Sequence, residues 1–330
     1  MDRKIQWGIL STATIAREQV IPAMLQSKFC NVLAITSRDI KKAEEIAEDF
    51  GIAKFYDDNQ ELLNDSEIEA VYIPLPNHLH VEWAKKALSA GKHVLVEKPI
   101  ALSSTSAKSL LDEAKKYPNL KIAEAFMYKF HPQWIKAKEL VDSGEIGTLK
   151  TIQSSFSFFD DDAHSITNNK SYGGGSLMDI GCYSISISRL LFNEEPKSVL
   201  ASIEYHSEYE VDILANGILE FEKGSSSFFC ATQLDYTQQA QIFGTKGSIK
   251  FELPFNPPID TCSKIWLTKD EITTEIKFDI CNQYTLQADA FSRAIIENIQ
   301  LPVHLNDAIN NMIIIEKLHE SNAEGKRVKI

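Results

Sequence analysis

Lys98 has the type and the position of a residue that transfers protons. It follows the apolar run 94–96 and precedes Pro99. The run predicts a buried strand, and a proline, which cannot donate to a sheet ladder, predicts that the strand ends there. The carboxyl ends of buried parallel strands form the edge at which open α/β sheets bind ligands. A partly desolvated lysine at that edge can give or take a proton, and the alternative is a surface lysine.

Asp179 and Tyr183 stand four residues apart in the segment 173–192, which predicts a helix, so their side chains share one face. Hydride removal from an alcohol needs a base for the hydroxyl proton, and the reverse reaction needs the matching acid. A tyrosine, with an ordinary pKa of about 10, is a poor base unless a cation favours its phenolate. We expect Tyr183 to be the general acid/base, with Lys98 lowering its pKa and holding the carbonyl oxygen. Asp179 would orient the substrate or the tyrosine. The alternatives are a tyrosine ring in the core and an aspartate favoured by the helix dipole.

The first strand-to-helix turn has the spacing of a pyrophosphate-binding turn. Residues 5–10 predict a strand and 14–26 a helix. Between them, Ser11, Ala13 and Ala16 have the spacing of G-x-G-x-x-G, although none is glycine. Small residues there let the backbone turn tightly and approach a pyrophosphate. The alternative is an ordinary turn between a strand and a helix.

The residues after the second expected strand, 31–36, indicate which dinucleotide would bind. An NAD site usually has an acidic residue at this point to hold the ribose hydroxyls, whereas Ser37 and Arg38 could hold a 2′-phosphate. We therefore expect NADP(H) to be preferred, with NAD(H) possible. The alternative is a solvated Arg38, followed by Asp39 as the cap of the next helix.

The composition argues against several classes of protein. Lys and Arg number 34 and Asp and Glu 46, a formal net charge of −12, so we expect no nucleic acid partner. The apolar stretches are strand-sized, so we expect no membrane partner, and residues 1–5 do not resemble the start of a signal peptide. The five cysteines are dispersed without a Cys-x-x-Cys pair, which favours reduced thiols and a cytoplasmic location.

The pattern of elements predicts two domains. Strands and helices alternate up to about residue 125, which predicts a dinucleotide-binding α/β domain over 1–125 with a parallel sheet. Successive strands between 197 and 277, with helices elsewhere, predict an α+β domain over 126–330 with a mostly antiparallel sheet. The further strands expected in the first domain are 70–73, 94–96 and 120–125, and the further helices are 39–50, 78–90 and 103–117. We expect Pro22 to kink the helix over 14–26 or to shift its start.

Five ordered motifs resemble the Gfo/Idh/MocA oxidoreductases, the glucose–fructose oxidoreductase and inositol dehydrogenase family. They are Trp7–Ala13, Pro74–His80, Glu97–Pro99, Glu124–Tyr128 and Gly173–Tyr183. The resemblance covers essentially the whole chain. It implies an α/β Rossmann domain followed by an α+β domain with a large, mostly antiparallel open-faced sheet. Because an exposed apolar sheet face is a liability for a lone subunit, we expect a homodimer or a higher homo-oligomer.

The resemblance also implies an activity and a set of site residues. It implies reversible hydride transfer between a nicotinamide and a sugar-like or cyclic alcohol, with Lys98 contacting the reacting oxygen. Many members have histidine at the position of Tyr183, and a tyrosine there is similar to dimeric dihydrodiol dehydrogenases and some aldose dehydrogenases. The expected cofactor contacts are Ser11, Thr12, Ala13, Thr14, Ile15, Ser37, Arg38, Leu75, Pro76, Asn77, His80, Glu97 and Lys98.

Further candidates are weighed by residue type. We expect Tyr128, His131 and Phe159 to contact a carbohydrate-like substrate, although Phe159 also fits a strand with neighbouring phenylalanines. His78 and His80 flank one residue, but the sequence offers no third ligand, so we expect no metal. The acidic run 160–162 with His164 has metal-binding residue types, and a solvated loop is the favoured interpretation.

The sequence thus predicts an NAD(P)-dependent oxidoreductase acting on a sugar, polyol, keto-sugar or dihydrodiol. The alternative is a regulatory sensor that binds the dinucleotide without turnover. A third interpretation is an enzyme that uses the nicotinamide transiently, without net redox change. A sensor needs no proton relay, so Lys98, Asp179 and Tyr183 favour the enzyme.

Overall fold

The computed structural model describes residues 3–330, which form two compact units. The first unit comprises the residues up to Phe130 together with Asn282–Ile309. The second comprises His131–Cys281 and Asn310–Ile330. Each unit is therefore discontinuous in sequence, and a segment from the C-terminal part of the chain packs with the N-terminal sheet. The functional division near residue 125, between cofactor binding and substrate binding, stays a prediction.

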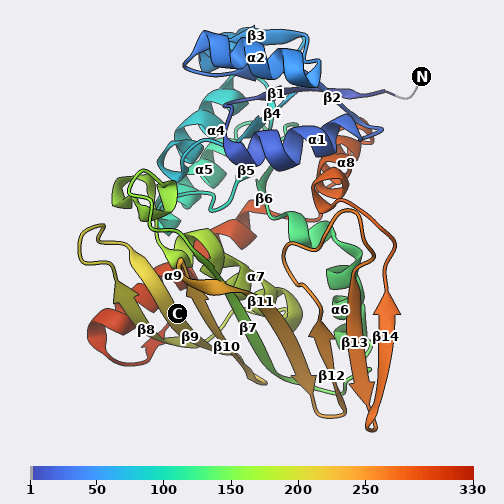
Figure 1. Cartoon of the computed structure of the whole chain (residues 1–330), viewed down its shortest axis with the longest axis vertical. Coiled ribbons are helices and arrows are strands. Elements are labelled where there is room, and N and C mark those ends of the chain that lie inside the picture. Colours follow the sequence, from blue (N-terminus) through green and yellow to red (C-terminus); the bar gives the residue numbers. More distant parts are fainter. Residues whose placement is uncertain (1–2) are drawn as a thin grey trace. The chain divides into compact units, whose positions relative to one another are not determined.

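The first unit is built on a six-stranded parallel sheet in the order β3-β2-β1-β4-β5-β6 (Figure 1). The strands are β1 Ile5–Ile9, β2 Cys30–Thr36, β3 Lys54–Tyr56, β4 Ala70–Ile73, β5 His93–Glu97 and β6 Ile122–Ala125. The strand order reverses between β1 and β4, and ligands of open α/β sheets bind beyond the carboxyl ends of the strands at such a reversal. The predicted Rossmann architecture is confirmed.

Helical segments connect these strands, and local sequence signals explain where they begin. The segments are η1 Ala16–Val20, α1 Ile21–Leu25, α2 Ile40–Phe50, α3 Asn59–Asn64, η2 Asn77–Leu79, α4 His80–Ser89, α5 Ser104–Ala114 and η3 Met127–Phe130. Asp39 caps α2 by accepting the Lys41 N–H at 3.1 Å, and Ser103 caps α5 by accepting the Ser106 N–H at 3.1 Å. Pro22 lies in the first turn of α1, which the π-helical turn η1 precedes, so the proline shifts the start of the α-helix.

Helix α8, Gln283–Ile296, completes the core of the first sheet from the C-terminal part of the chain. The buried Trp7 ring of β1 packs against Phe291, with 5.4 Å between the ring centroids. The Trp7 indole N–H donates to Ser292 Oγ at 3.1 Å. A buried indole normally needs such an acceptor, because an unmet donor is costly in an apolar interior. The sequence pattern did not indicate this pairing.

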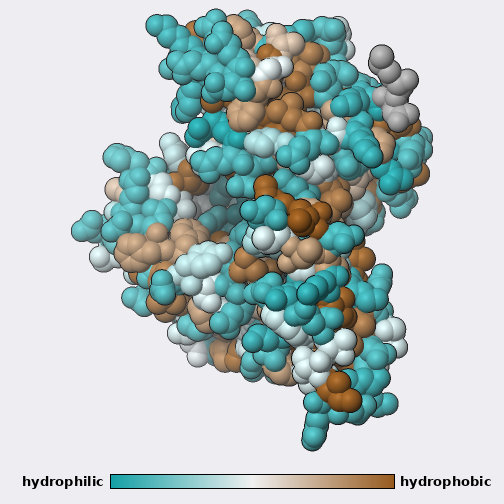
Figure 2. Space-filling model, turned by 45° about the vertical axis from the view of Figure 1, so that its right-hand side comes forward, coloured by the Kyte–Doolittle hydropathy of each residue, from teal (hydrophilic) through white to brown (hydrophobic). Residues whose placement is uncertain are grey.

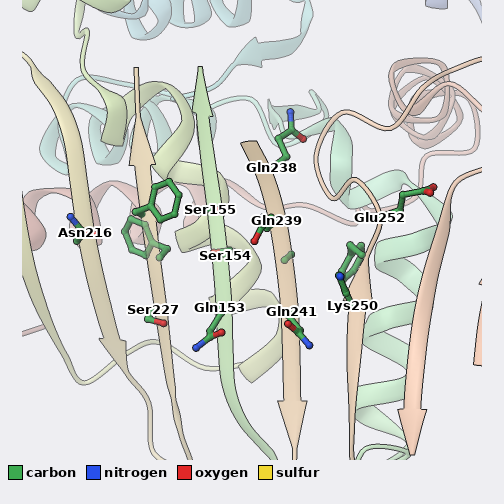
Figure 3. A pocket seen from close by; sticks show the side chains of 14 residues that line it. Gln153, Ser154, Ser155, Asn216, Ser227, Gln238, Gln239, Gln241, Lys250 and Glu252 are labelled. Carbon is green, nitrogen blue, oxygen red and sulfur yellow. The ribbon is translucent and has the colours of Figure 1, made fainter. Parts of the chain in front are cut away.

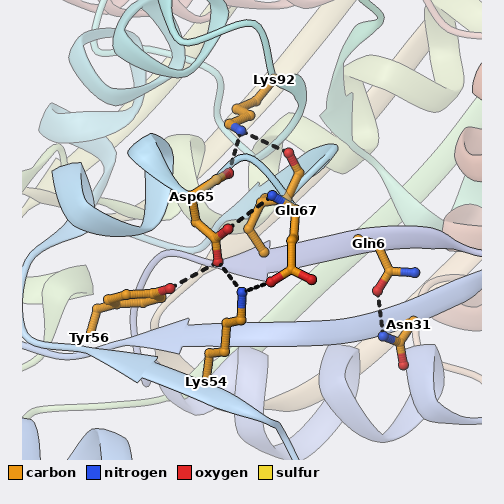
Figure 4. A network of polar contacts seen from close by, with 8 residues as sticks. Gln6, Asn31, Lys54, Tyr56, Asp65, Glu67 and Lys92 are labelled. Atoms are coloured by element: carbon orange, nitrogen blue, oxygen red, sulfur yellow. Dashed lines mark hydrogen bonds and ion pairs between the residues drawn. The ribbon is translucent and has the colours of Figure 1, made fainter.

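A polar network joins β3 to the segments that precede β4 and β5 (Figure 4). The Lys54 ammonium binds the Asp65 carboxylate at 2.7 Å and also pairs with Glu67. The Tyr56 hydroxyl donates to the same Asp65 carboxylate at 2.9 Å. The buried Lys92, just before β5, donates to the Asp65 and Ile68 carbonyls at 2.7 and 2.8 Å. Lys92 and Ile68 precede β5 and β4, so at these two strands the network lies at the end opposite the candidate site.

The second unit is built on a nine-stranded mixed sheet in the order β14-β13-β12-β11-β7-β10-β9-β8-β15 (Figure 1). Only β7 and β10 pair in parallel, so the predicted mostly antiparallel sheet is confirmed. The strands are β7 Leu149–Phe159, β8 Ser198–Tyr205, β9 Asp212–Glu220, β10 Ser225–Ala231, β11 Gln233–Gly244, β12 Gly247–Phe251, β13 Lys264–Lys269, β14 Ile272–Lys277 and β15 Val328–Lys329.

Helix α7 covers one face of this sheet by a close approach through small residues. Helix α7 comprises Cys182–Phe192, and the other helical segments of this part of the chain are α6 Pro132–Asp142, η4 Ile166–Asn168, η5 Lys170–Tyr172, η6 Leu177–Gly181 and α9 Leu305–Glu324. The Ser154 hydroxyl of β7 donates to the Ser184 hydroxyl of α7 at 3.0 Å. Ser188 in α7 donates to Ser226 in β10 at 2.6 Å. These buried hydroxyl pairs fix the helix against the two central strands.

The other face of the sheet is open and more polar than we expected. It forms a shallow hollow of about 650 Å³ over strands β7, β9, β10, β11 and β12 (Figure 3). Its labelled side chains include Gln153, Ser155, Asn216, Ser227, Gln239, Gln241 and Lys250. The surface drawn in Figure 2 is likewise mostly hydrophilic, with separate hydrophobic patches. No helix among residues 3–330 is long and apolar enough to cross a membrane.

Candidate functional site

The first sheet brings the expected cofactor contacts to one edge. Its strands are parallel, so the segments that follow β1, β2, β4 and β5 meet at the carboxyl side. Residues 11–15 follow β1, 37–38 follow β2, 75–77 follow β4, and Lys98 follows β5. Four segments separated in sequence thus face the same region, at the reversal of the strand order.

The turn after β1 contains a serine in a backbone conformation that favours glycine. Ser11 has φ 135°, a conformation that favours glycine, and its hydroxyl accepts the Ala13 N–H at 3.1 Å. This local bond supports the turn where a glycine would need no support. Arg17, which the sequence reasoning missed, donates through Nε to the Thr12 carbonyl at 3.0 Å. The signal in the sequence that could have indicated this contact is the position of Arg17, one helical turn after the residues of the loop.

The end of β2 presents a cation. Arg38 is exposed, and no ion pair involves it among residues 3–330. Ser37 Oγ accepts the Asp39 N–H at 3.3 Å, while the Asp39 carboxylate is used as the cap of α2. The carboxylate next to Arg38 therefore accepts a backbone N–H and forms no ion pair with Arg38, so the guanidinium is accessible to an anion.

Lys98 lies in a polar cluster at the end of β5. It is half-buried, and the Lys98–Pro99 peptide is cis. Glu97 accepts the Tyr72 hydroxyl at 2.6 Å through one carboxylate oxygen and the Lys98 N–H at 3.1 Å through the other. Tyr284 of α8 is close enough to this cluster to be influenced by its charges. Burial is the main cause that raises the pKa of Tyr284, the charge of Glu97 raises it further, and the charge of Lys98 lowers it. The sequence reasoning missed Tyr284, which is distant in the chain.

His80 is placed beneath this edge and not on its surface. Its ring is fully buried at the start of α4. The Nδ1 atom lies 2.8 Å from the Pro99 carbonyl oxygen and Nε2 lies 2.7 Å from the Leu75 carbonyl oxygen. Burial lowers the pKa of His80 to about 4, assisted by the charge of Lys98. Direct contact with a cofactor stays a prediction, and the observed contacts are to the protein backbone.

Asp179 and Tyr183 lie on the π-helical turn η6 and the start of α7 in the second unit. Asp179 is half-buried, and Tyr183 is 4% exposed. The Tyr183 ring packs against Phe156 and Phe255, with centroid distances of 5.7 and 5.3 Å. Two aromatic contacts hold the ring in one orientation, and π-helical turns inside helices often occur at functional sites.

Asp212 anchors the start of the helix that carries this pair. Its buried carboxylate accepts the Leu177 N–H and the Ser176 hydroxyl, both at 2.7 Å. Gly175 has φ 112°, and a Cβ atom there would lie 2.1 Å from the Asp212 carboxylate. The last glycine of the run 173–175 is therefore required both by its backbone conformation and by the approach of Asp212.

The expected substrate contacts have different environments. Tyr128 is fully buried, edge-on to Phe126 at 5.7 Å between centroids. His131 is 1% exposed and caps α6, accepting the Gln133 N–H at 3.2 Å. Phe159, at the end of β7, is 65% exposed. Exposure leaves Phe159 accessible to a ligand, whereas the other two have evident structural roles, and all three remain predictions as substrate contacts.

The acidic loop 160–164 uses its carboxylates in local turns. Asp160 accepts the Asp162 N–H at 3.0 Å, and Asp162 accepts the His164 N–H at 2.9 Å. Among residues 3–330, no group of three or more His, Cys, Asp or Glu side chains could hold a metal ion. Asx turns account for this spacing of aspartates.

Family models match both parts of the chain. Residues 5–124 match the model described as an oxidoreductase family with an NAD-binding Rossmann fold, GFO_IDH_MocA. Residues 134–250 match the GFO/IDH/MocA C-terminal domain. These two matches cover most of the chain.

Full-length relatives agree with these matches. The chain is 41% identical to an uncharacterized oxidoreductase of Rhizobium meliloti, covering 97% of this chain and 98% of the relative. It is 34% identical to a D-xylose 1-dehydrogenase (NADP(+)) of Haloferax volcanii, covering 99% and 100%. Its structure is similar to that of the aldose-aldose oxidoreductase from Caulobacter crescentus complexed with glycerol. The TM-score is 0.92 at 25% identity, covering 99% of this chain and 100% of the other.

Proposed function

The chain belongs to the Gfo/Idh/MocA family of NAD(P)-binding oxidoreductases, and from this premise we propose that it is an NADP-dependent dehydrogenase of aldoses or related compounds. The related compounds are polyols, keto-sugars and dihydrodiols. The family match over both parts of the chain carries the reaction class. The D-xylose dehydrogenase and the aldose-aldose oxidoreductase named above support an aldose as the first substrate to test.

The preference for NADP rests on Arg38. Its exposed guanidinium follows β2, where a dinucleotide fold places the adenosine ribose, and its neighbouring carboxylate caps a helix. Guanidinium binds phosphate through charge-assisted hydrogen bonds. The turn at Ser11, whose hydroxyl accepts the Ala13 N–H, follows β1, where a dinucleotide fold holds the pyrophosphate. The described residues therefore fit an NADP molecule along the sheet edge.

In the proposed mechanism, the nicotinamide supplies or accepts the hydride, and the protein manages the proton. Tyr183 takes the hydroxyl proton during oxidation and returns it during reduction. Lys98 holds its ammonium toward the reacting oxygen, stabilises the negative charge that develops there, and favours the tyrosinate. Asp179 orients the substrate. The aromatic contacts of the Tyr183 ring keep the phenol from rotating away.

The test is the absorbance of NADPH at 340 nm with a panel of aldoses, polyols, α-dicarbonyls and dihydrodiols. We expect turnover with at least one aldose, and its loss in Tyr183→Phe. Lys98→Met should reduce kcat by about 10²-fold or more, the scale of a lost acid–base contribution. Near wild-type turnover in either variant would refute the assigned roles. Tight NADPH binding without turnover of any compound would favour the sensor, which the family matches and the relatives named above do not support.

We also propose that the chain works as a homodimer in the cytoplasm. The hollowed sheet face supports self-association, because amide and hydroxyl side chains that can bond a second copy line it. The five cysteines form no disulfide bonds within residues 3–330, which is typical of a reducing compartment. Light scattering at micromolar concentration should give twice the mass of the chain, and a monomeric mass would contradict the dimer.

A further inference from the structure

One peptide group next to Lys98 is held from both sides by buried polar side chains. The carbonyl oxygen of Pro99 lies 2.8 Å from His80 Nδ1. The Ile100 N–H of the same peptide donates to the Glu124 carboxylate at 2.7 Å. His80 is 0% exposed and Glu124 8%, so both contacts are shielded from water. We call this arrangement the 99–100 clamp.

His80 extends the clamp to the segment that follows β4. Its Nε2 lies 2.7 Å from the carbonyl oxygen of Leu75, the first residue of the expected cofactor segment 75–77. Only an imidazolium can donate through both nitrogens. With its pKa lowered to about 4 by burial, the ring carries one N–H at neutral pH and donates to one carbonyl at a time.

A core that needed only packing would not require these groups. Burying a polar side chain costs free energy that hydrogen bonds offset only in part, and an apolar residue of similar size would avoid this cost. Here the two polar groups meet at a single peptide, one residue from the lysine assigned to the reacting oxygen. Small displacements of a reacting group can lower a rate by about 10²-fold.

We propose that His80 and Glu124 are positioning residues, which fix the backbone at Lys98 relative to the segment 75–77. The proposal rests on the proposed role of Lys98. Neither side chain needs to touch substrate. Glu124 sets the position of the Ile100 N–H, and His80 lies between the carbonyls of Pro99 and Leu75 and donates its N–H to one of them at a time.

Variants of Glu124 separate the bond from the charge. Glu124→Gln keeps an acceptor oxygen at the same reach, whereas Glu124→Asp keeps the charge on a shorter side chain. If the bond to Ile100 is what matters, kcat with NADP+ and the best aldose of the panel should fall by about 10²-fold in Glu124→Ala. It should recover in Glu124→Gln more than in Glu124→Asp, with KM little changed. The reverse order would show that the charge is required and would overturn the proposal.

Variants of His80 separate its two contacts. The side-chain amide of asparagine places its nitrogen close to the position of Nδ1, and that of glutamine close to the position of Nε2. His80→Asn should preserve the bond to Pro99 and lower kcat less than His80→Gln does, with weaker NADPH binding. His80→Gln should preserve the bond to Leu75 and NADPH binding, with reduced kcat. Equal kinetic constants in the two variants would contradict the division of roles.

A readout without turnover keeps this proposal separate from the proposed function. The exchange rate of the Ile100 amide hydrogen should rise in Glu124→Ala, and the NMR signal of the 13Cε-labelled Lys98 should move and return in Glu124→Gln. If the wild type turns over no compound, the proposed function fails while these signals still test the clamp. Unchanged exchange and an unmoved Lys98 signal would overturn the clamp, as would normal kcat in every variant that folds. If Glu124→Ala does not fold, the comparison of Glu124→Gln with Glu124→Asp decides.

Discussion

Replacement of His131 by asparagine should remove one titration that makes the fold sensitive to acid. The Nδ1 atom of His131 accepts the Gln133 N–H at 3.2 Å, so it carries no proton in the folded protein. Its Nε2 lies 3.5 Å from the Cys281 sulfur. Burial lowers the pKa of His131 from 6.5 to about 4. Protonation would both break the cap of α6 and place a cation at a helix N-terminus.

The sign and the size of the effect follow from the two pKa values. Below pH 6.5 the unfolded chain binds a proton at His131, whereas the folded chain does so only near pH 4. Stability from this group is therefore lost as the pH falls from about 7 toward 4. The loss between pH 7 and pH 5 is about 2 kcal/mol, and the limiting value well below pH 4 is about 3 kcal/mol.

The assay compares the free energies of unfolding of wild type and His131→Asn in urea between pH 7 and pH 5. Asparagine is among the preferred N-cap residues, so the variant keeps an acceptor for the Gln133 N–H without a titrating group. All other titrating groups are common to both proteins and cancel in the difference. Trp134 is 1% exposed and stacked on Phe251, so its fluorescence reports the unfolding of this unit.

The expected result is a stability difference that shifts by about 2 kcal/mol in favour of asparagine between pH 7 and pH 5. Parallel pH curves for the two proteins would refute the reasoning, because they would mean that His131 titrates alike when folded and unfolded. The same variant tests the predicted substrate contact, since a role in binding would raise KM without changing the pH slope of stability.

Other changes have equally specific consequences. Arg38→Ala should weaken NADP binding by roughly 10–100-fold, the scale of a lost charge-assisted bond, and leave NAD binding unchanged. Equal weakening for both nucleotides, or a similar effect of Lys42→Ala in the following helix α2, would contradict a 2′-phosphate contact. Gly175→Ala should lower the melting temperature and kcat together. The added Cβ would lie 2.1 Å from an Asp212 carboxylate oxygen, so the carboxylate would have to move. Gly91→Ala is the control with positive φ but nothing within 4 Å, and should cost only about 1–2 kcal/mol of stability. A Gly175→Ala protein no less stable than Gly91→Ala would show that the approach of Asp212 is not required.

Local features of the fold were predictable because local sequence determines them. Asp39 and Ser103 cap helices through bonds to N–H groups two or three residues away, and Gly51 ends α2 with φ 67°. The parallel sheet was predictable from the alternation of apolar runs with helices. The edge strand β3, Lys54–Tyr56, was missed because it has three residues and none is fully buried.

Contacts between distant segments could not be predicted from pattern. Tyr284 joins the cluster of Glu97 and Lys98 from a helix near the other end of the chain. His80 was expected near the cofactor from its place in a motif, but which atoms its nitrogens face depends on how two loops pack. The open sheet face was expected to be apolar, yet glutamine, serine and asparagine side chains line much of it. Such side chains are compatible with partial contact with water.

The packing of α8 on β1 has a consequence for how the protein is made. The first sheet needs Phe291 and Ser292 to cover Trp7, but the 151 residues His131–Cys281 must be synthesised in between. At roughly 5–20 residues per second, the nascent sheet emerges from the ribosome about 8–30 s before its covering helix. During that interval part of an apolar sheet face is exposed. We therefore expect the nascent chain to bind chaperones that recognise hydrophobic surfaces.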